Sequence, residues 1–113
     1  MSDAIRAGRV WGCFEGERLV GITAAGQPHG PIWVLNLIGI LPDARGAGHG
    51  AALLDAVYCA ARSAGAEALR LTTTVKMEAL VAFYVRQGFS ATHVAYPSHR
   101  RDRHLRIFMK RPL

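Results

Sequence analysis

The glycine-rich segment Arg45–Ala51 is the part of the chain whose residue types and spacing could do chemistry. It reads Arg-Gly-Ala-Gly-His-Gly-Ala, and it follows an apolar run and opens a stretch with helical periodicity. The first N–H groups of a helix have no intrahelical acceptor and lie at the positive end of the helix dipole. Glycines let such groups approach a ligand without a Cβ clash, and Arg45 adds a cation. The segment therefore predicts a main-chain anion site for phosphate or diphosphate.

Two other interpretations of this segment compete with an anion site. It could be a structural turn that binds nothing. It could also be a dinucleotide site, because Gly46, Gly48 and Ala51 fit the pattern G-x-G-x-x-A. A dinucleotide fold has its first glycine close behind a strand and an acidic residue about 20 positions later. Here Pro42–Arg45 intervene, and the next predicted strand ends in Thr72–Thr74, which disfavours the dinucleotide interpretation.

The predicted elements place this segment between a central strand and a helix. Ile32–Leu41 is apolar, rich in β-branched residues and bounded by prolines, which indicates a buried strand. A helix is predicted over His49–Ala64, with Gly65 at its end, because apolar residues recur there at helical spacing. The other predicted elements are strands at Val10–Phe14, Leu19–Ala24, Leu69–Thr73, Ser90–Ala95 and His104–Lys110, a helix at Lys76–Gln87, and a loop at Gln27–Pro31.

This order, β-β-β-α-β-α-β-β, predicts an α/β (α+β) fold. We expect a mixed, mostly antiparallel central sheet with helices packed on it, and one parallel crossover around the first helix. The chain has 113 residues, of which 50% are apolar, so we expect a single domain spanning residues 1–113. No apolar run reaches the roughly 18 residues that span a bilayer, and the N-terminus lacks the apolar core of a secretory signal. We therefore expect a cytoplasmic protein.

Charge and cysteine content bear on partners and metals. The net charge of +6 is concentrated in the stretch Arg100–Arg111. Such a cluster can bind nucleic acid, attract an anionic cofactor or remain solvated; no aromatic interleaving or helix-turn-helix pattern accompanies it, so nucleic-acid binding is disfavoured. Cys13 and Cys59 are expected to be buried free thiols. The histidines show no metal-ligand spacing, and we expect no metal site.

Two motifs resemble those of the GNAT superfamily of N-acetyltransferases. The first is Ile38–Pro42 followed by Arg45-x-x-Gly48-x-Gly50, similar to a strand ending in V-x-P and then [Q/R]-x-x-G-x-[G/A]. The second is Tyr84–Phe89, similar to Y-x-x-x-G-F at the expected distance downstream. In addition, Gly30–Leu35 is similar to a Trp-containing strand of a bacterial subgroup. The resemblance covers about residues 8–113.

The resemblance implies an acetyl-CoA-dependent N-acetyltransferase, in which a primary amine attacks the thioester directly. Tyr84 would supply or relay a proton to the CoA sulfur, since a phenol with a pKa of about 10 is protonated at neutral pH. Asn36 would position water or substrate, and no general base is evident among the weak candidates Glu15, His29 and Glu78. The implied acetyl-CoA-binding residues are Ile38, Gly39 and Ile40 for the pantetheine arm, and Arg45, Gly46, Ala47, Gly48, His49, Gly50 and Ala51 for the pyrophosphate.

The chain also departs from the family pattern. Met77 stands where asparagine is common, seven residues before Tyr84, and Leu80 replaces a small residue. Family members begin with a strand and two helices that form one wall of the acceptor pocket, whereas this chain begins almost at a hairpin. The groove could be open, completed by a second subunit, or part of a non-catalytic acyl-CoA-binding module of the same fold. We expect a homodimer, because apolar surface would otherwise be uncovered. The acceptor, a small-molecule or peptide amine, is not specified further.

Overall fold

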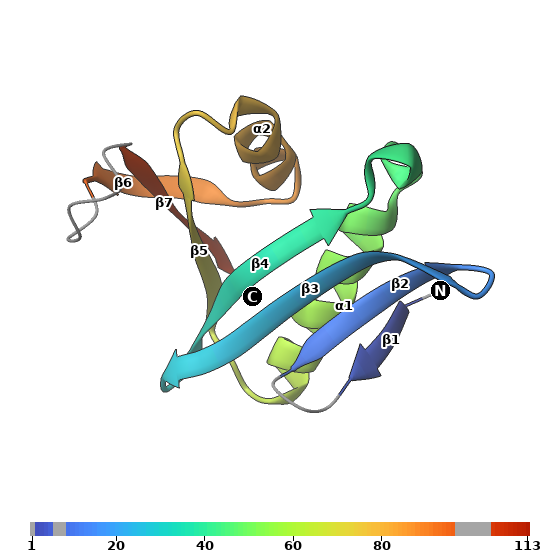
Figure 1. The fold of residues 1–113 in the computed structure, drawn as a ribbon. Helices are drawn as coiled ribbons and strands as arrows, with labels where there is room; N and C mark the ends of the chain where they lie inside the picture. The colour runs from blue at the N-terminus through green and yellow to red at the C-terminus, as the bar shows by residue number, and fades with distance from the viewer. Residues whose placement is uncertain (1, 6–8, 97–104) are drawn as a thin grey trace. The chain divides into compact units, whose positions relative to one another are not determined.

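The structure is a computed structural model that describes residues 2–5, 9–96 and 105–113, with the main chain alone for residues 2–5 and 27–29 (Figure 1). The chain divides into two compact units. The first contains the residues up to Leu69 together with Leu113, and the second contains Arg70–Pro112. The single-domain organisation expected for residues 1–113 stays a prediction. Across the described ranges, no helix has both the length and the apolarity needed to cross a membrane.

The first unit is an antiparallel sheet with a helix against one face. Its strands are β1 (Ser2–Ile5), β2 (Val10–Glu15), β3 (Arg18–His29) and β4 (Ile32–Ile40). They lie in that order, and each is antiparallel to the next. A short 3-10 turn, η1 (Pro42–Ala44), and the glycine-rich segment lead from β4 into α1 (His49–Ser63). Figure 1 shows α1 running along the sheet, so the end of β4 and the start of α1 enclose the glycine-rich segment.

Helix α1 forms where the apolar spacing predicts it. Its buried residues recur at positions one and four apart along one face, which is the stripe that a helix needs to cover a sheet. The core of the first unit includes Leu53, Leu54, Val57, Tyr58 and Ala61 from α1, with Trp11, Cys13, Val20, Thr23, Ala25, Trp33, Leu35, Ala68 and Leu69 from the strands and Ala44 from η1. Packing of these side chains fixes the direction of α1 and therefore the position of its first turn.

Strand β4 contains a bulge at Asn36. The two residues that flank Asn36 pair with consecutive residues of β3, Ala25 and Ala24, so Asn36 is one residue more than the ladder needs. The fully buried Thr23 donates from Oγ1 to the carbonyl oxygen of Leu37 at 2.8 Å, beside the bulge. A bulge of this kind bends its strand and interrupts the regular ladder.

The start of β5 (Ala68–Thr74) lies beside the start of β4. Glu67, directly before β5, donates its main-chain N–H to the carbonyl of Pro31, directly before β4, at 2.9 Å. The C-terminal Leu113 in turn donates to the carbonyl of Glu67 at 2.9 Å. Since β4 and β5 begin side by side with α1 between them in the chain, this arrangement supports the parallel crossover expected from the sequence.

The second unit contains the rest of β5, α2 (Glu78–Arg86), β6 (Ser90–Ala95) and β7 (Arg106–Pro112). β6 and β7 are antiparallel, and β7 lies between β5 and β6. Gly88, at φ 94°, follows the end of α2, as its place at the helix stop predicted. The buried residues of this unit are Leu71, Thr73, Tyr84, Phe89 and Met109.

Three features differ from the sequence-based expectations. The structure adds β1, which pairs with β2 ahead of the expected hairpin. β3 continues to His29, so the loop expected at Gln27–Pro31 shrinks to a turn at Gly30–Pro31, where Gly30 has φ 57°. Cys59 is exposed rather than buried, because it lies on the side of α1 away from the sheet; Cys13 is a buried free thiol, as expected.

Candidate active site

The glycine-rich segment forms an open turn between β4 and α1. Gly46 and Gly48 have φ values of 84° and 83°, in the left-handed region where a side chain is strained. A Cβ built on either glycine would meet no heavy atom within 4 Å. Glycine is therefore required at these two positions because of the positive φ values, and not because the protein packs closely against them. Open space lies over the main chain at both positions.

Among the described residues, none accepts a hydrogen bond from the main-chain N–H groups of this turn. The first bond of α1 runs from the N–H of Ala52 to the carbonyl of Gly48, at 3.1 Å. The N-cap residue Gly48 offers no side-chain acceptor. Within the described part of the chain, no carbonyl or side chain accepts a hydrogen bond from the N–H groups of Gly46–Ala51. A row of unsatisfied donors at the positive end of a helix dipole is the arrangement that binds an anion.

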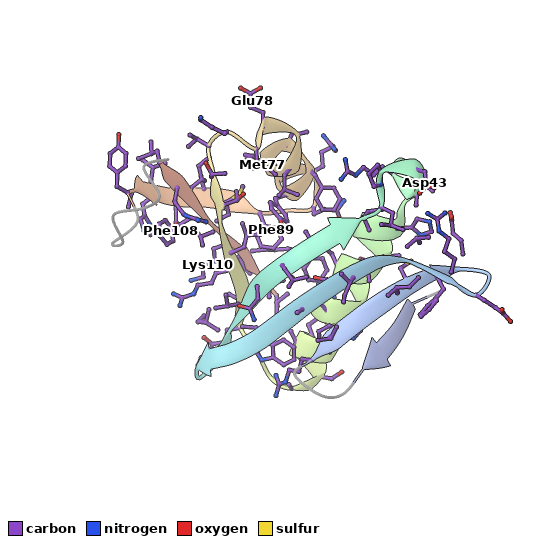
Figure 2. All side chains as sticks on the ribbon, in the orientation of Figure 1. Asp43, Met77, Glu78, Phe89, Phe108 and Lys110 are labelled. Atoms are coloured by element: carbon purple, nitrogen blue, oxygen red, sulfur yellow. The ribbon has the colours of Figure 1, made fainter. Side chains whose placement is uncertain are left out.

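Arg45 and Asp43 place charges at the edge of the turn. Arg45 is exposed, and its Nε donates to the carbonyl of Ile40 at 3.1 Å, so the guanidinium lies at the end of β4. Figure 2 shows Asp43 on the connection from β4 to α1. Nη2 of Arg18 donates to Oδ1 and Oδ2 of Asp43 at 3.0 and 2.9 Å. The carboxylate nearest in sequence to the anion site is thus paired with a cation.

His49, the first residue of α1, is held by two side chains of β2. Sγ of Cys13 lies 3.0 Å from Nδ1 of His49, and Oε2 of Glu15 lies 2.9 Å from Nε2. The side chain of His49 is 14% exposed and that of Glu15 46% exposed, whereas Cys13 is 1% exposed. Sequence analysis predicted a site role for His49 through its main chain, but it did not connect these three side chains. They are 34 and 36 positions apart, and no local pattern reports such a contact.

The residues predicted for the pantetheine arm lie on β4, which leads to the open turn. Ile38, Gly39 and Ile40 pair with β3 residues, and Gly39 is exposed with no heavy atom within 4 Å of a built Cβ. Asn36 is exposed at the bulge. The first unit therefore brings together, on one strand and the turn after it, all the residues predicted to bind the cofactor. The bulge itself was missed by sequence reasoning.

Tyr84 belongs to the second unit. It is 4% exposed in α2, with its ring 5.7 Å from that of Phe83 and 5.6 Å from that of Phe89, the latter in an edge-on arrangement.

Among the weak candidate bases, Glu78 is exposed at the start of α2, where Figure 2 labels it beside Met77. The side chain of His29 and the basic residues 100–104 lie outside the described residues. Within the described ranges, no group of three or more His, Cys, Asp or Glu side chains is arranged to hold a metal ion.

The sequence of this chain matches known acetyltransferases. The model of the acetyltransferase (GNAT) family matches residues 2–89. The chain is also 41% identical over 81 residues to the mycothiol acetyltransferase of Propionibacterium freudenreichii subsp. shermanii. That match covers 70% of this chain and 25% of the relative, so the chain spans about a quarter of that protein's length.

Solved structures confirm the expected fold. A Desulfovibrio desulfuricans protein assigned to the GNAT family superposes with a TM-score of 0.83 at 25% identity, covering 92% of this chain and 68% of that one. A Bacillus anthracis protein described as a streptothricin acetyltransferase, solved in complex with acetyl coenzyme A, gives a TM-score of 0.87 at 14% identity, with coverage of 93% and 62%. These likenesses show the mixed sheet with packed helices that the element order predicts.

Proposed function

The chain belongs to the GNAT family of acetyltransferases, and we propose that it transfers the acetyl group of acetyl-CoA to a primary amine by direct attack on the thioester. The observation that carries this proposal is the run of N–H groups from Gly46 to Ala51, at the start of α1, that have no acceptor among the residues the structure describes. The diphosphate of CoA presents several anionic oxygens, each able to accept from such donors. The acceptor amine belongs to a small molecule or a peptide.

The cofactor-binding roles follow the order of these residues along β4 and the turn. Exposed Gly39, between Ile38 and Ile40, leaves room for an extended pantetheine arm to lie along the strand, bonded to main-chain groups. The turn then binds the diphosphate. Arg45 keeps its Nε on the carbonyl of Ile40, which leaves its two Nη nitrogens for a phosphate oxygen. Bound in this way, acetyl-CoA supplies an activated acetyl group.

The transfer itself needs a deprotonated amine, a polarised carbonyl and a proton for the leaving thiolate. We assign the last role to Tyr84, since a phenol ordinarily keeps its proton at neutral pH and can donate it. Asn36 cannot act as a base, but at the bulge its amide can orient a water molecule or the acceptor. Because no carboxylate among the described residues is placed as the base, we propose that a chain of water molecules carries the proton of the amine to solvent.

A non-catalytic acyl-CoA-binding module of the same fold is the alternative. It is favoured by one observation: the carboxylate of Glu15, considered as a base from the sequence, lies 2.9 Å from Nε2 of His49 and therefore holds that ring instead of serving as the base. The two functions share the anion site and differ in turnover. Purified protein separates them, because both should bind acetyl-CoA in calorimetry, whereas release of free CoA thiol in the presence of amines requires the enzyme. Absence of binding at millimolar acetyl-CoA would contradict both.

We also propose that the protein is a homodimer. Three large apolar side chains, Leu19, Ile22 and Leu37, are 48%, 38% and 50% exposed. Ile22 and Leu37 lie on the sheet face opposite α1, since their neighbours on β3 and β4 alternate toward the helix. A second copy that covered this face would remove that apolar surface from water. Sedimentation equilibrium should give twice the chain mass, and Leu37→Lys should shift it to the monomer; a monomeric parent protein would contradict the proposal.

A further inference from the structure

His49 is the single anchored side chain of the anion-binding turn. Of the residues Gly46–Ala51, every other member is glycine or alanine, so His49 alone has a side chain longer than a methyl group. The main chain of this turn makes no hydrogen bond through its N–H groups within the described residues. Three glycines in such a short stretch leave many conformations open to the main chain. The packing of α1 restrains this turn from one end, and the contacts of the His49 ring are the restraint that a side chain of the turn itself adds.

Both ring nitrogens of His49 are engaged. The carboxylate of Glu15 accepts a hydrogen bond, so Nε2 of His49 carries the proton at that 2.9 Å contact. Nδ1 is then the acceptor, and the thiol of Cys13 donates to it at 3.0 Å. Cys13 and Glu15 lie two residues apart on β2, and both face the helix. These roles are assigned for a neutral ring; a protonated ring would donate from Nδ1 to the sulfur, and both contacts would hold the ring in the same place.

We propose that Cys13 and Glu15, acting through His49, position the first turn of α1 so that its N–H groups are preorganised to bind the diphosphate of acyl-CoA. This inference rests on the proposed function. It makes Cys13 and Glu15 positioning residues, since neither is needed to touch the ligand. It assigns no role in the acetyl transfer itself, so affinity for acetyl-CoA should change while turnover at saturation should not.

The size of the effect follows from the fraction of molecules whose turn is ready to bind. The apparent Kd equals the intrinsic Kd divided by that fraction, so a turn that is competent in about a tenth of the molecules binds roughly tenfold more weakly. Glu15 is the best residue to change, because its side chain is 46% exposed and its removal leaves the core intact. Glu15→Ala should raise the Kd for acetyl-CoA roughly tenfold.

Conservative variants distinguish the effect of the hydrogen bonds to His49 from the effect of the charge on Glu15. Glu15→Gln keeps a carbonyl oxygen that can accept from Nε2, so we expect it to retain most of the affinity that Glu15→Ala loses. Cys13→Ser keeps a donor for Nδ1, whereas Cys13→Ala removes it. Matched controls are Glu17→Ala, which removes the same charge two residues on, in the exposed turn that follows β2, and Cys59→Ala on the exposed side of α1. Both controls should bind acetyl-CoA as the parent protein does.

The experiment is isothermal calorimetry of each variant with acetyl-CoA, together with kcat at saturating acetyl-CoA and urea unfolding as a check of folding. Support requires a higher Kd in Glu15→Ala, recovery in Glu15→Gln, an unchanged kcat and unaffected controls. Equal Kd values for Glu15→Ala and the parent protein, or an equal loss in Glu17→Ala, overturn the inference and leave the proposed function standing. A parent protein that binds no acetyl-CoA overturns the proposed function and this inference with it.

Discussion

Leu53 of α1 lies directly over Gly21 of β3. A Cβ built on Gly21 would come within 3.2 Å of Cδ1 of Leu53 and within 2.6 Å of Cδ1 of Ile40. Leu53 is fully buried. The absence of a side chain at Gly21 therefore lets α1 approach the sheet closely, and this approach sets the height of the helix start above β4.

Gly21→Ala should destabilise the protein by about 1–3 kcal/mol, because the added methyl group overpacks this contact. Leu53→Ala should cost about 2–5 kcal/mol through the cavity that it leaves. In the double variant the new methyl group fills part of that cavity, so the loss should be smaller than the sum by at least about 0.5 kcal/mol. Urea unfolding of the four proteins gives the coupling energy, and strict additivity would refute the contact.

Gly48→Ala should weaken acetyl-CoA binding as well as folding. Gly48 has φ 83° and Gly65, just beyond the end of α1, has φ 81°, and neither has a heavy atom within 4 Å of a built Cβ. Alanine at either site should therefore cost a similar amount, about 1–2 kcal/mol. At Gly48 alone the methyl group also occupies the space over the anion-binding N–H groups. Calorimetry should show a higher Kd for Gly48→Ala and the parent Kd for Gly65→Ala.

Tyr84→Phe should lower kcat by about a hundredfold or more, the usual scale for losing a general acid, while the Kd for acetyl-CoA stays the same. Tyr96→Phe is the control, because Tyr96 is 72% exposed. The assay is release of CoA thiol at saturating substrates, once an acceptor amine has been found by screening. Parent-like turnover in Tyr84→Phe would remove the phenol from the mechanism.

Arg18→Ala should weaken acetyl-CoA binding without much effect on stability. The pair with Asp43 is solvent-exposed, with side chains 54% and 64% accessible, so its loss should cost no more than about 1 kcal/mol in folding. It leaves the carboxylate of Asp43 unpaired beside an anion site, and the resulting repulsion should fade with salt, since the screening length is about 10 Å at 0.1 M. Adding Asp43→Asn to Arg18→Ala should restore the affinity. A Kd that does not change with salt in Arg18→Ala would contradict this account.

The sequence predicted the parts of the fold that depend on near neighbours. The helical spacing of Leu54, Val57 and Tyr58 is a local signal, and so is the placing of glycines before α1; both agree with the structure. The exposure of Cys59 could also have been predicted, since it falls between the buried positions of α1. It was misjudged because its sequence neighbours are apolar, although a helix sends adjacent residues to different faces.

The parts that depend on distant neighbours could not be predicted from one sequence. The hydrogen bonds from His49 to Cys13 and Glu15 join positions on different elements, and no spacing rule links them. The strand β1 exists through its pairing with β2 and has little apolar pattern of its own. The bulge in β4 could not be predicted because apolar residues occupy both faces of this strand, so the sequence shows no alternation whose phase Asn36 could shift.

Asn36 is the one extra residue between two halves of β4 whose side chains alternate in the same sense relative to the sheet. Trp33 and Leu35 before it and Ile38 and Ile40 after it lie on the α1 side of the sheet. Deleting Asn36 would leave every one of them on that side, because the remaining residues then alternate without interruption. A chain without Asn36 would keep the architecture of the first unit, but β4 would be straight where the bulge now bends it. Insertion or deletion of a single codon could therefore add or remove the bend.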